Sequence, residues 1–359
     1  MDFGLSEEQE LLQDTVRGFV RGECPPQRLR EIYDAGGGFA PGLWLGLSEL
    51  GCAGLALPEA QGGAGLELLE CALVAEALGG GAFPSPFLGH TLAGLAIAHG
   101  GSDAQKQRWL PALASGEAIG TVAFGERGDR WLPGDWTAAL AGGRVSGAKV
   151  FVPHAERAAV TIVGTAGGGL ALVPGGTSGL RCEPIDAFDR SQGVVDLALD
   201  GAAAEALPGG RAAAERVVDA GLVLLAADAF GAAWRMIELA RDYVSVRKQF
   251  GAPLAQFQAV KHQLANLVTD TEPCRGLWWF AAHAWDHRRE EAAKAAAIAK
   301  AHVTDVAMDV GRGAFELHGG IGFTWECDLQ FWYKRATFDR HFLGTPDVHL
   351  DRNADLGGW

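Results

Sequence analysis

The stretch Arg247-Lys248-Gln249-Phe250-Gly251 closes a long apolar segment with helical periodicity that begins near Ala213. Cations in a last helical turn followed by glycine are typical of a helix C-terminus, and the five residues alone fit that simple role. An arginine at such a point also presents a planar fork that can grip a diphosphate through two hydrogen bonds. Arg247 is therefore a candidate diphosphate-binding residue.

Two further motifs follow in the C-terminal third. Phe257-Gln258-Ala259-Val260-Lys261 comes after a short loop and is typical of a helix start. His318-Gly319-Gly320-Ile321-Gly322 ends a later helical segment, and its glycines would let a ligand approach the backbone closely. Between them, Pro273 is expected to kink or break the helix that would otherwise run from Ala259 to His287. Each motif taken alone also fits an ordinary helix end.

Hydrophobic periodicity and glycine content divide the chain into three parts, which predicts an α+β protein. Residues 1–117 have helical periodicity, and Ser6 with Gln9 resembles a capping box. Residues 118–208 contain short apolar runs between glycine clusters, which predicts a small antiparallel β-domain. Residues 209–359 return to long helices. The expected strands contain residues 150–152, 160–163, 170–173 and 194–199.

Composition excludes several classes of protein. A formal net charge of -14 and an isoelectric point near 5.1 argue against a nucleic-acid partner or an anionic membrane partner. The six cysteines are scattered without a C-x-x-C pair, so reduced thiols and no metal site are expected. No segment of about 18 uncharged apolar residues and no basic, apolar leader are found, which predicts a cytoplasmic protein without membrane insertion.

In order and spacing, the three C-terminal motifs resemble the C-terminal helical domain of the acyl-CoA dehydrogenase family. The N-terminal third agrees, because residues 58–65 look like the P-E-x-x-G-G-x-G turn of that family. Residues 105–117 look like its Q-K-x-x-x-L-P-x-x-x-x-G-E stretch. The resemblance implies the acyl-CoA dehydrogenase fold, with a helical domain, a middle β-domain and a C-terminal four-helix bundle that makes oligomer contacts.

The resemblance also implies FAD as the cofactor, bound between subunits. In the family the three C-terminal motifs of one subunit hold the pyrophosphate and adenosine end of an FAD whose ring lies in the neighbouring subunit. The matching cofactor-binding candidates in this chain are Arg247, Gln249, Phe250, Phe257, Gln258, Glu316, Gly319 and Gly320.

The catalytic base of the family has no counterpart in this chain. The family reaction removes a proton from the α-carbon of an acyl-CoA thioester and passes the β-hydrogen as a hydride to flavin N5, which needs a carboxylate beside the α-carbon. Most members place a Glu directly before a Gly-Thr pair, and here Leu343 precedes Gly344-Thr345. A minority place it 26 residues before the motif arginine, a count that reaches Gly221. No catalytic residue is therefore expected.

Other acids near these positions match neither family pattern. They are interpreted as solvated helix or loop charges, and the alternative that one of them has taken over as the base stays open. These acids are Glu215, Asp219, Asp228, Asp339 and Asp347.

The β-domain also departs from the family. In the family segment T-E-P-x-x-G-S-D the Thr touches the flavin ring and the Ser helps to hold the acyl-CoA, whereas residues 124–129 here read F-G-E-R-G-D and lack both hydroxyls. The segment K-x-W-I-T-N reads K-V-F-V-P-H at residues 149–154. Pro153 replaces a Thr whose hydroxyl donates toward flavin N5, and proline has neither that hydroxyl nor an N–H.

The retained and lost motifs resemble the shorter, base-lacking subunit of bacterial heteromeric acyl-CoA dehydrogenases that act on steroid side chains. That resemblance implies a heterotetramer with a Glu-bearing partner subunit, half the usual number of FAD sites, an acyl-CoA substrate and an electron-accepting flavoprotein. Two alternatives stay open: a self-sufficient homo-oligomeric dehydrogenase with a relocated acid, and a catalytically silent structural subunit. The sequence does not indicate which acyl or steroid group is bound.

Overall fold

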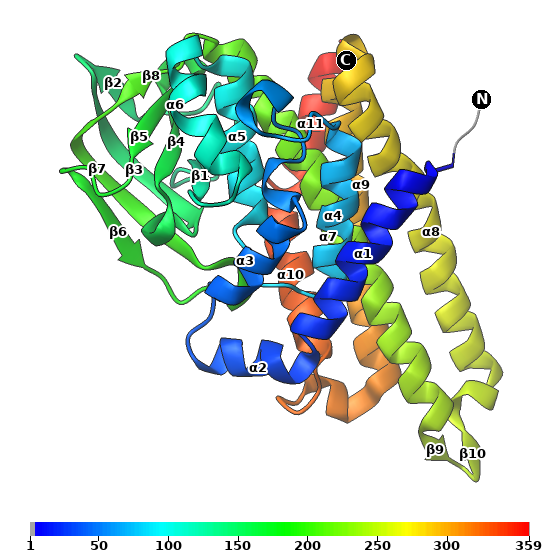
Figure 1. Cartoon of the computed structure of the whole chain (residues 1–359). Coiled ribbons are helices and arrows are strands. Elements are labelled where there is room, and N and C mark those ends of the chain that lie inside the picture. Colours follow the sequence, from blue (N-terminus) through cyan, green and yellow to red (C-terminus); the bar gives the residue numbers. More distant parts are fainter. Residues whose placement is uncertain (1–3, 359) are drawn as a thin grey trace.

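The computed structural model describes residues 4–358 of the 359-residue chain; Met1, Asp2 and Phe3, which bear on the expected lack of a leader, lie outside this range. The described residues form a helical N-terminal region, a β-region and a helical C-terminal region (Figure 1). The expected α+β fold of the acyl-CoA dehydrogenase type is confirmed. One large apolar core joins the two helical regions, and a smaller one lies between the β-sheets.

The N-terminal region consists of helices that pack against the C-terminal bundle. Helix α1 begins with the expected capping box, in which Ser6 Oγ accepts from the Gln9 N–H and Gln9 Oε1 accepts from the Ser6 N–H. It ends directly before Pro25, and Pro26 starts the next helix. The helices are α1 (Glu7–Glu23), α2 (Pro26–Asp34), α3 (Pro41–Glu49), α4 (Leu68–Gly80), α5 (Phe87–Gly100) and α6 (Asp103–Ala114).

The β-region contains two four-stranded sheets, ordered β1-β4-β5-β8 and β2-β3-β7-β6. All four expected runs lie in strands, and the antiparallel prediction holds for each pairing except the parallel pair β1–β4. The strands are β1 (Gly120–Ala123), β2 (Ala139–Ala141), β3 (Arg144–Pro153), β4 (Val160–Thr165), β5 (Gly169–Pro174), β6 (Leu180–Pro184), β7 (Val194–Ala203) and β8 (Glu205–Ala206).

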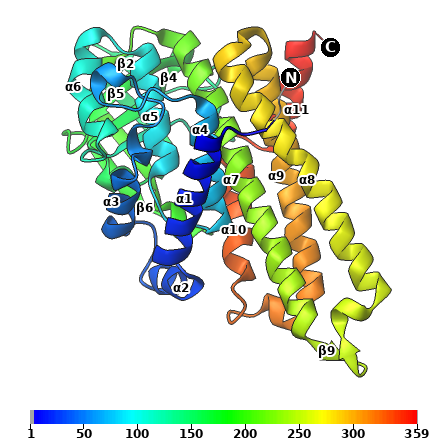
Figure 2. The ribbon, with the colours of Figure 1, turned by 45° about the vertical axis from the view of Figure 1, so that its right-hand side comes forward.

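Long helices build the C-terminal region, and Figure 2 shows α7, α8 and α9 side by side. Helix α7 is long and apolar enough to cross a membrane, but 89% of its most apolar window is buried, as in a core helix. The elements are α7 (Gly210–Val246), β9 (Lys248–Gln249), β10 (Ala252–Pro253), α8 (Gln258–His287), α9 (Arg289–His318), the 3₁₀ turn η7 (Gly319–Phe323), α10 (Leu329–His341) and α11 (Pro346–Gly357).

Of the expectation that Pro273 kinks or breaks the helix, the break is wrong. Helix α8 runs through Pro273 without ending. Pro273 is exposed, so water can hydrate the carbonyl that its missing N–H leaves unbonded. The next residue, Cys274, and Trp278 one turn beyond it are fully buried, and their packing offsets the lost hydrogen bond.

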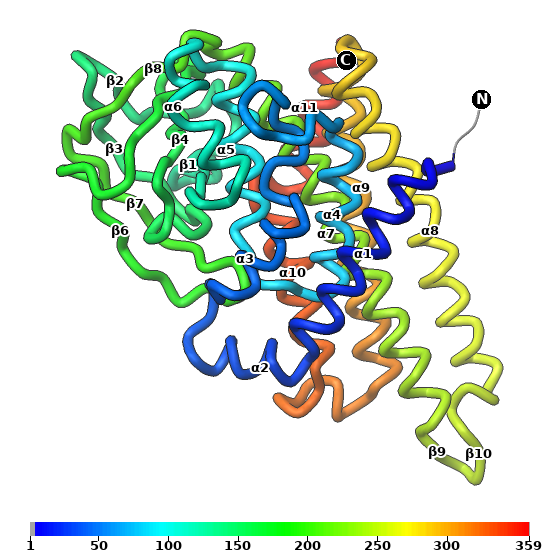
Figure 3. The backbone as a smooth tube through the Cα atoms, in the orientation of Figure 1, coloured from blue at the N-terminus to red at the C-terminus, as the bar shows by residue number. Residues whose placement is uncertain are grey.

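Residues 247–251 do follow a helix end, with Arg247 as the C-cap, but Gly251 belongs to a hairpin and not to the helix cap. Helix α7 ends at Val246, and Gln249 and Ala252 then pair in a hairpin whose two-residue turn is Phe250-Gly251. Both turn residues have positive φ, +52° and +81°, as this tight turn type requires. The backbone trace in Figure 3 shows that the hairpin projects past the ends of the neighbouring helices.

Candidate functional site

The residues that match the family's FAD-binding motifs gather at one end of the helical bundle. The rings of Tyr243, near the end of α7, and His318, at the end of α9, stack with centroids 4.6 Å apart. Near the start of α8, Gln263 Nε2 donates to Glu316 Oε2 over 3.0 Å. The three motifs are therefore neighbours in space. We call Arg247, Gln249, Phe250, Phe257, Gln258, Glu316, Gly319 and Gly320 the open cluster.

Side chains of the open cluster face solvent. The guanidinium of Arg247 makes no ion pair or hydrogen bond with any residue in the range 4–358, whereas Arg241 on the same helix pairs with Asp242 over 2.8 Å. Phe250 at the hairpin tip is 93% exposed and meets Phe257 edge to face, with ring centroids 6.1 Å apart. A fully charged group and a large apolar ring thus lie free on one projecting element.

The glycine turn after α9 leaves the backbone accessible. Gly319 has a φ of +66°, and a Cβ built on Gly319 or Gly320 meets no atom within 4 Å. Beside the turn lies a groove of about 450 Å³ whose wall includes Phe315, Glu316 and Phe323. The turn therefore gives a ligand the close backbone approach that its sequence predicts.

The two positions of the family base lie against each other and are filled. A Cβ built on Gly221 comes within 2.4 Å of Leu343 Cδ1, and Leu343 is fully buried. Next to it, the ring of Phe342 meets the ring of Trp131 edge to face, with centroids 5.3 Å apart. No carboxylate stands at this place. We call Gly125, Trp131, Gly221, Phe342 and Leu343 the closed cluster.

Two motif residues of the β-region survive as a buried ion pair. Lys149 Nζ donates to Glu126 Oε1 over 2.6 Å, and Glu126 also accepts from the N–H and hydroxyl of Thr137. Burial would raise the pKa of Glu126, but these hydrogen bonds outweigh it and lower that pKa, while burial lowers the pKa of Lys149 to about 8. The pair places the two motif segments side by side, and the lost hydroxyls at Gly125 and Pro153 belong to one site.

Asp219 and Asp339 are buried and the Asp228 side chain is only 15% exposed, so the interpretation of these three acids as solvated charges is wrong. Asp219 pairs with Arg352 over 2.7 Å, and Asp228 pairs with Arg335 over 2.8 Å. Asp339 is 1% exposed. The remaining two, Glu215 and Asp347, are partly exposed and exposed respectively.

Buried polar groups surround Asp228 and Asp339. Arg335 also donates to Ser191 Oγ over 2.8 Å and to the Phe83 carbonyl over 3.0 Å. Burial and the nearby Asp228 carboxylate raise the pKa of Asp339, which favours its neutral form. The enclosed space that Asp228 and Asp339 share is about 10 Å³, room for one water at most. Neither acid can meet a thioester there.

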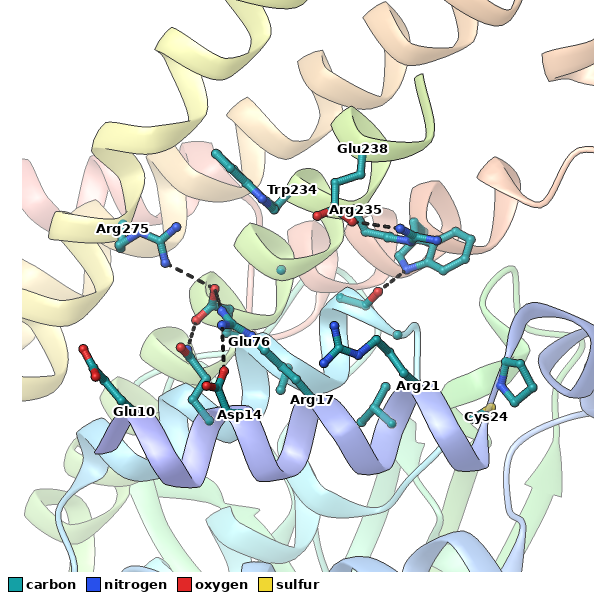
Figure 4. A pocket seen from close by; sticks show the side chains of 18 of the residues that line it. Glu10, Asp14, Arg17, Arg21, Cys24, Glu76, Trp234, Arg235, Glu238 and Arg275 are labelled. Carbon is teal, nitrogen blue, oxygen red and sulfur yellow. Dashed lines mark hydrogen bonds and ion pairs between the residues drawn. The ribbon is translucent and has the colours of Figure 1, made fainter. Parts of the chain in front are cut away.

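A hollow of about 800 Å³ lies between α1, α4, α7 and α8 (Figure 4). At its floor the Glu76 carboxylate accepts from Gln13, from Arg17 over 3.0 Å and from Arg275 over 3.4 Å. Carboxylates and guanidiniums alternate around the wall, so the hollow has no excess charge to select an ion. The groups labelled in the figure include Glu10, Asp14, Arg17, Arg21, Glu76, Arg235, Glu238 and Arg275.

The residues of the two clusters fit different parts of FAD. A free arginine and an accessible glycine turn in the open cluster suit the diphosphate of a dinucleotide. In the closed cluster Trp131, Phe342 and Leu343 are 5%, 3% and 0% exposed, and their side chains fill the place that the family gives to the flavin ring and the base. The open cluster thus offers groups suited to a diphosphate, whereas the closed cluster is filled by its own side chains.

Sequence patterns did not single out two residues that shape the site. In the family motif T-E-P-x-x-G-S-D the Ser lies six residues after the Thr. The same count from Gly125 reaches Trp131, so a comparison extended beyond residue 129 would have found this tryptophan. Lys300 is fully buried, and its Nζ donates to the carbonyl of Phe342 over 2.9 Å and to that of Asp339. No local pattern marks Lys300, because its partners Asp339 and Phe342 lie 39 and 42 residues further along the chain.

Comparisons with known proteins point to one family. Residues 6–117 match the model of the acyl-CoA dehydrogenase N-terminal domain, and residues 209–355 match that of the C-terminal domain. The acyl-CoA dehydrogenase IpdE2 of Mycolicibacterium smegmatis is 31% identical over 97% of this chain and 98% of its own length.

Two solved structures of two-component assemblies are similar over nearly the whole chain. A chain of the Tcur3481-Tcur3483 steroid ACAD G363A variant is 34% identical, with a TM-score of 0.90 and 98% coverage of both chains. A chain of the ChsE4-ChsE5 complex from Mycobacterium tuberculosis is 27% identical, with a TM-score of 0.91 and coverage of 100% of this chain and 99% of that one.

Proposed function

The chain belongs to the acyl-CoA dehydrogenase family, whose cofactor is FAD, and we propose that it is the base-lacking subunit of a heteromeric enzyme of that family. In this proposal the chain grips the pyrophosphate and adenosine end of an FAD whose ring lies in a partner subunit. The partner carries the glutamate that removes the α-proton of the acyl-CoA.

The observation that carries the proposal is the contrast at the two motif sites. The Arg247 guanidinium has no partner among the residues that the structure describes, while the base positions Leu343 and Gly221 are packed against each other. A charged side chain left free on a projecting hairpin is suited to a ligand or partner from outside. A buried leucine offers no group that accepts a proton.

Each part of the open cluster has a stated task. Arg247 forms a bidentate, charge-assisted contact with the pyrophosphate, and the Gly319-Gly320 backbone allows the dinucleotide to approach. Phe250 covers an apolar part of the partner or cofactor, since 93% of its surface is exposed in the isolated chain. When bound, FAD supplies the acceptor for the substrate's β-hydrogen.

We further propose a CoA thioester from steroid breakdown as the substrate. A chain of an assembly described as a steroid ACAD is 34% identical to this chain over 98% of its length. Electron transfer to a flavoprotein acceptor is part of the proposal through family membership.

Co-expression tests the division of labour. The chain is produced alone and together with an acyl-CoA dehydrogenase homologue that carries the catalytic glutamate, and flavin absorbance and acyl-CoA oxidation are measured on each preparation. We expect little flavin and no activity from the chain alone, and both from the complex. A yellow, active preparation of the chain alone would contradict the proposal.

A matched pair of variants tests the role of Arg247 within the complex. Arg247→Ala removes the proposed diphosphate contact, and about ten- to hundredfold weaker retention of FAD is expected from the loss of a charge-assisted bidentate pair. Arg241→Ala removes an equally exposed arginine of the same helix that pairs only with Asp242, and FAD retention should stay at the wild-type level. Equal retention in both variants would place the FAD elsewhere.

A relocated acid is the second candidate function, and the burial of Asp228 and Asp339 is the observation that bears on it. Raised carboxyl pKa values in a protein interior are common at catalytic sites. Here the enclosed space holds about 10 Å³ and opens to no thioester-sized cavity lined by these acids. Dehydrogenase activity that disappears from the isolated chain with Asp228→Asn or Asp339→Asn would favour this candidate.

A further inference from the structure

Trp131 fills the space above Gly125 in the closed cluster. The tryptophan is 5% exposed, and a Cβ built on Gly125 would lie 2.6 Å from its Cζ3 and 2.9 Å from its Cη2. The same Cβ would lie 2.8 Å from the Val150 carbonyl oxygen, which cannot move aside as a side chain could. A residue larger than glycine at position 125 and tryptophan at position 131 therefore exclude each other.

Counted without a gap from position 125, the Thr and Ser of the family motif fall at positions 125 and 131. Here a small residue and a very large one replace them, and the large one occupies the room that both hydroxyl side chains leave open. The far edge of Trp131 meets Phe342, which directly precedes the filled base position Leu343. Trp131 thus packs the segment without the motif hydroxyls against the segment without the base.

Trp131 is held on several sides. Its Nε1 donates to Asp129 Oδ1 over 2.7 Å, and its carbonyl accepts from Trp136 Nε1 over 3.1 Å. Trp136 in turn stacks on Phe124 with centroids 5.0 Å apart, and Lys149 Nζ lies 5.4 Å from the Trp136 ring. These contacts fix the side chain, so it is a permanent filling and not a lid.

We propose that Trp131 closes this chain's own flavin-ring site by filling the space that the ring would need. The inference rests on the proposed function, since it assumes that the partner supplies the single complete ring site. It adds that a side chain of this subunit, Trp131, keeps a flavin ring out of this subunit's own site.

Riboflavin is the probe that isolates this inference, because it carries the flavin ring without the diphosphate and adenosine that the open cluster would bind. Trp131→Ser restores the family's residue and opens the space above Gly125. We expect the full-length variant to bind riboflavin at least about tenfold more tightly than the wild type in a fluorescence-quenching titration, since a buried aromatic contact is worth at least that factor. Trp131→Phe keeps a filling ring and should bind as weakly as the wild type.

A second tryptophan controls for a general loosening of the fold. Trp279→Ser removes a side chain from the wall of the distant hollow between α1 and α8, and riboflavin binding should stay at the wild-type level. Riboflavin binding by the wild type as tight as by Trp131→Ser would overturn the inference. So would a well-folded Trp131→Ser chain that binds no riboflavin.

Flavin stoichiometry of the wild-type complex keeps the inference testable even where Trp131→Ser does not fold. FAD released from the denatured complex is divided by the number of pairs, and one FAD per pair is expected, while two would overturn the closure. The proposed function fails separately, through undiminished FAD in the Arg247→Ala complex. If the Trp131→Ser chain binds riboflavin while the Arg247→Ala complex keeps its full FAD content, the closure by Trp131 is supported and the diphosphate contact of Arg247 is rejected.

Discussion

The closed and open clusters both lie at positions that match family motifs, but their side chains are packed in opposite ways. In the closed cluster the side chains satisfy one another, so that Leu343 lies on Gly221 and Trp131 on Gly125 and Phe342. In the open cluster the Arg247 guanidinium pairs with no residue in the range 4–358, and Phe250 meets only the edge of Phe257 and stays 93% exposed. The difference teaches that the chain's own packing fills one set of motif positions and leaves the other set available to a molecule that binds from outside.

Restoring only the base should break the closed cluster without restoring activity. Leu343→Glu places a carboxylate at a fully buried position against Gly221, and an unpaired buried charge should lower the free energy of unfolding by about 3 kcal/mol or more. Urea unfolding followed by tryptophan fluorescence measures the loss, and Leu343→Met, which keeps volume and polarity, should cost less than about 1.5 kcal/mol. A stable Leu343→Glu chain that oxidises acyl-CoA would mean that the cluster opens readily.

Acid should weaken the packed interior next. Burial holds the pKa of His90 and His154 at about 4 and that of His349 at about 3, below the ordinary value of 6.5. Between those values the unfolded chain binds protons that the folded chain does not, so stability is full above the ordinary pKa and falls as the pH drops below it. His349 contacts the closed cluster, because its Nε2 donates to the Leu343 carbonyl over 2.9 Å.

Each of these histidines should contribute a loss on the order of 1–2 kcal/mol between pH 7 and pH 5. Urea unfolding across this pH range measures the slope. The slope should fall in His349→Gln, which does not titrate, and should stay unchanged in His283→Gln, whose parent side chain is exposed on α8. An unfolding free energy independent of pH in this range would show that the buried histidines take up protons without cost.

Much of the fold could be predicted from the sequence, and the exceptions have long-range causes. The capping box of α1 and the glycine-bounded strands depend on neighbouring residues, so local patterns predicted them. The helix through Pro273 persists because distant partners bury Cys274 and Trp278. The burial of Asp228 depends on Arg335, which is 107 residues away.

The candidate site divides along the same line. The missing base at Leu343 follows from counting within a motif, and so does the candidate role of Arg247. That the base position is filled does not follow, because it requires the meeting of Trp131, Phe342 and Gly221 from three separate elements. The projecting hairpin also escaped local reasoning, since a cationic helix end and glycine read as an ordinary cap.

A smaller effect is expected for the neutral acid beneath the closed cluster. Asp339→Asn replaces a carboxyl whose pKa burial and Asp228 have raised, so an uncharged amide of the same shape should change the unfolding free energy by less than about 1 kcal/mol. Asp228→Asn is the contrasting variant, because it removes the partner of buried Arg335 and should cost about 3 kcal/mol or more. Equal losses in both would assign the proton to Asp228 instead.

The smallest effect on the fold should come from the most exposed ring of the open cluster. Phe250→Ala removes a side chain that is 93% exposed, so the unfolding free energy of the isolated chain should change by no more than about 0.5 kcal/mol. In the complex with the Glu-bearing partner the same change should weaken association and lower the FAD content, since nearly the whole ring is left uncovered by its own chain. Sedimentation and flavin absorbance of the complex measure both, with Leu11→Ala on α1, 69% exposed, as a matched control. Substitutions in the closed cluster should change the free energy of unfolding, and substitutions in the open cluster should change only assembly and FAD content. A Phe250→Ala chain that unfolds easily while its complex keeps full FAD would contradict this assignment of the two clusters.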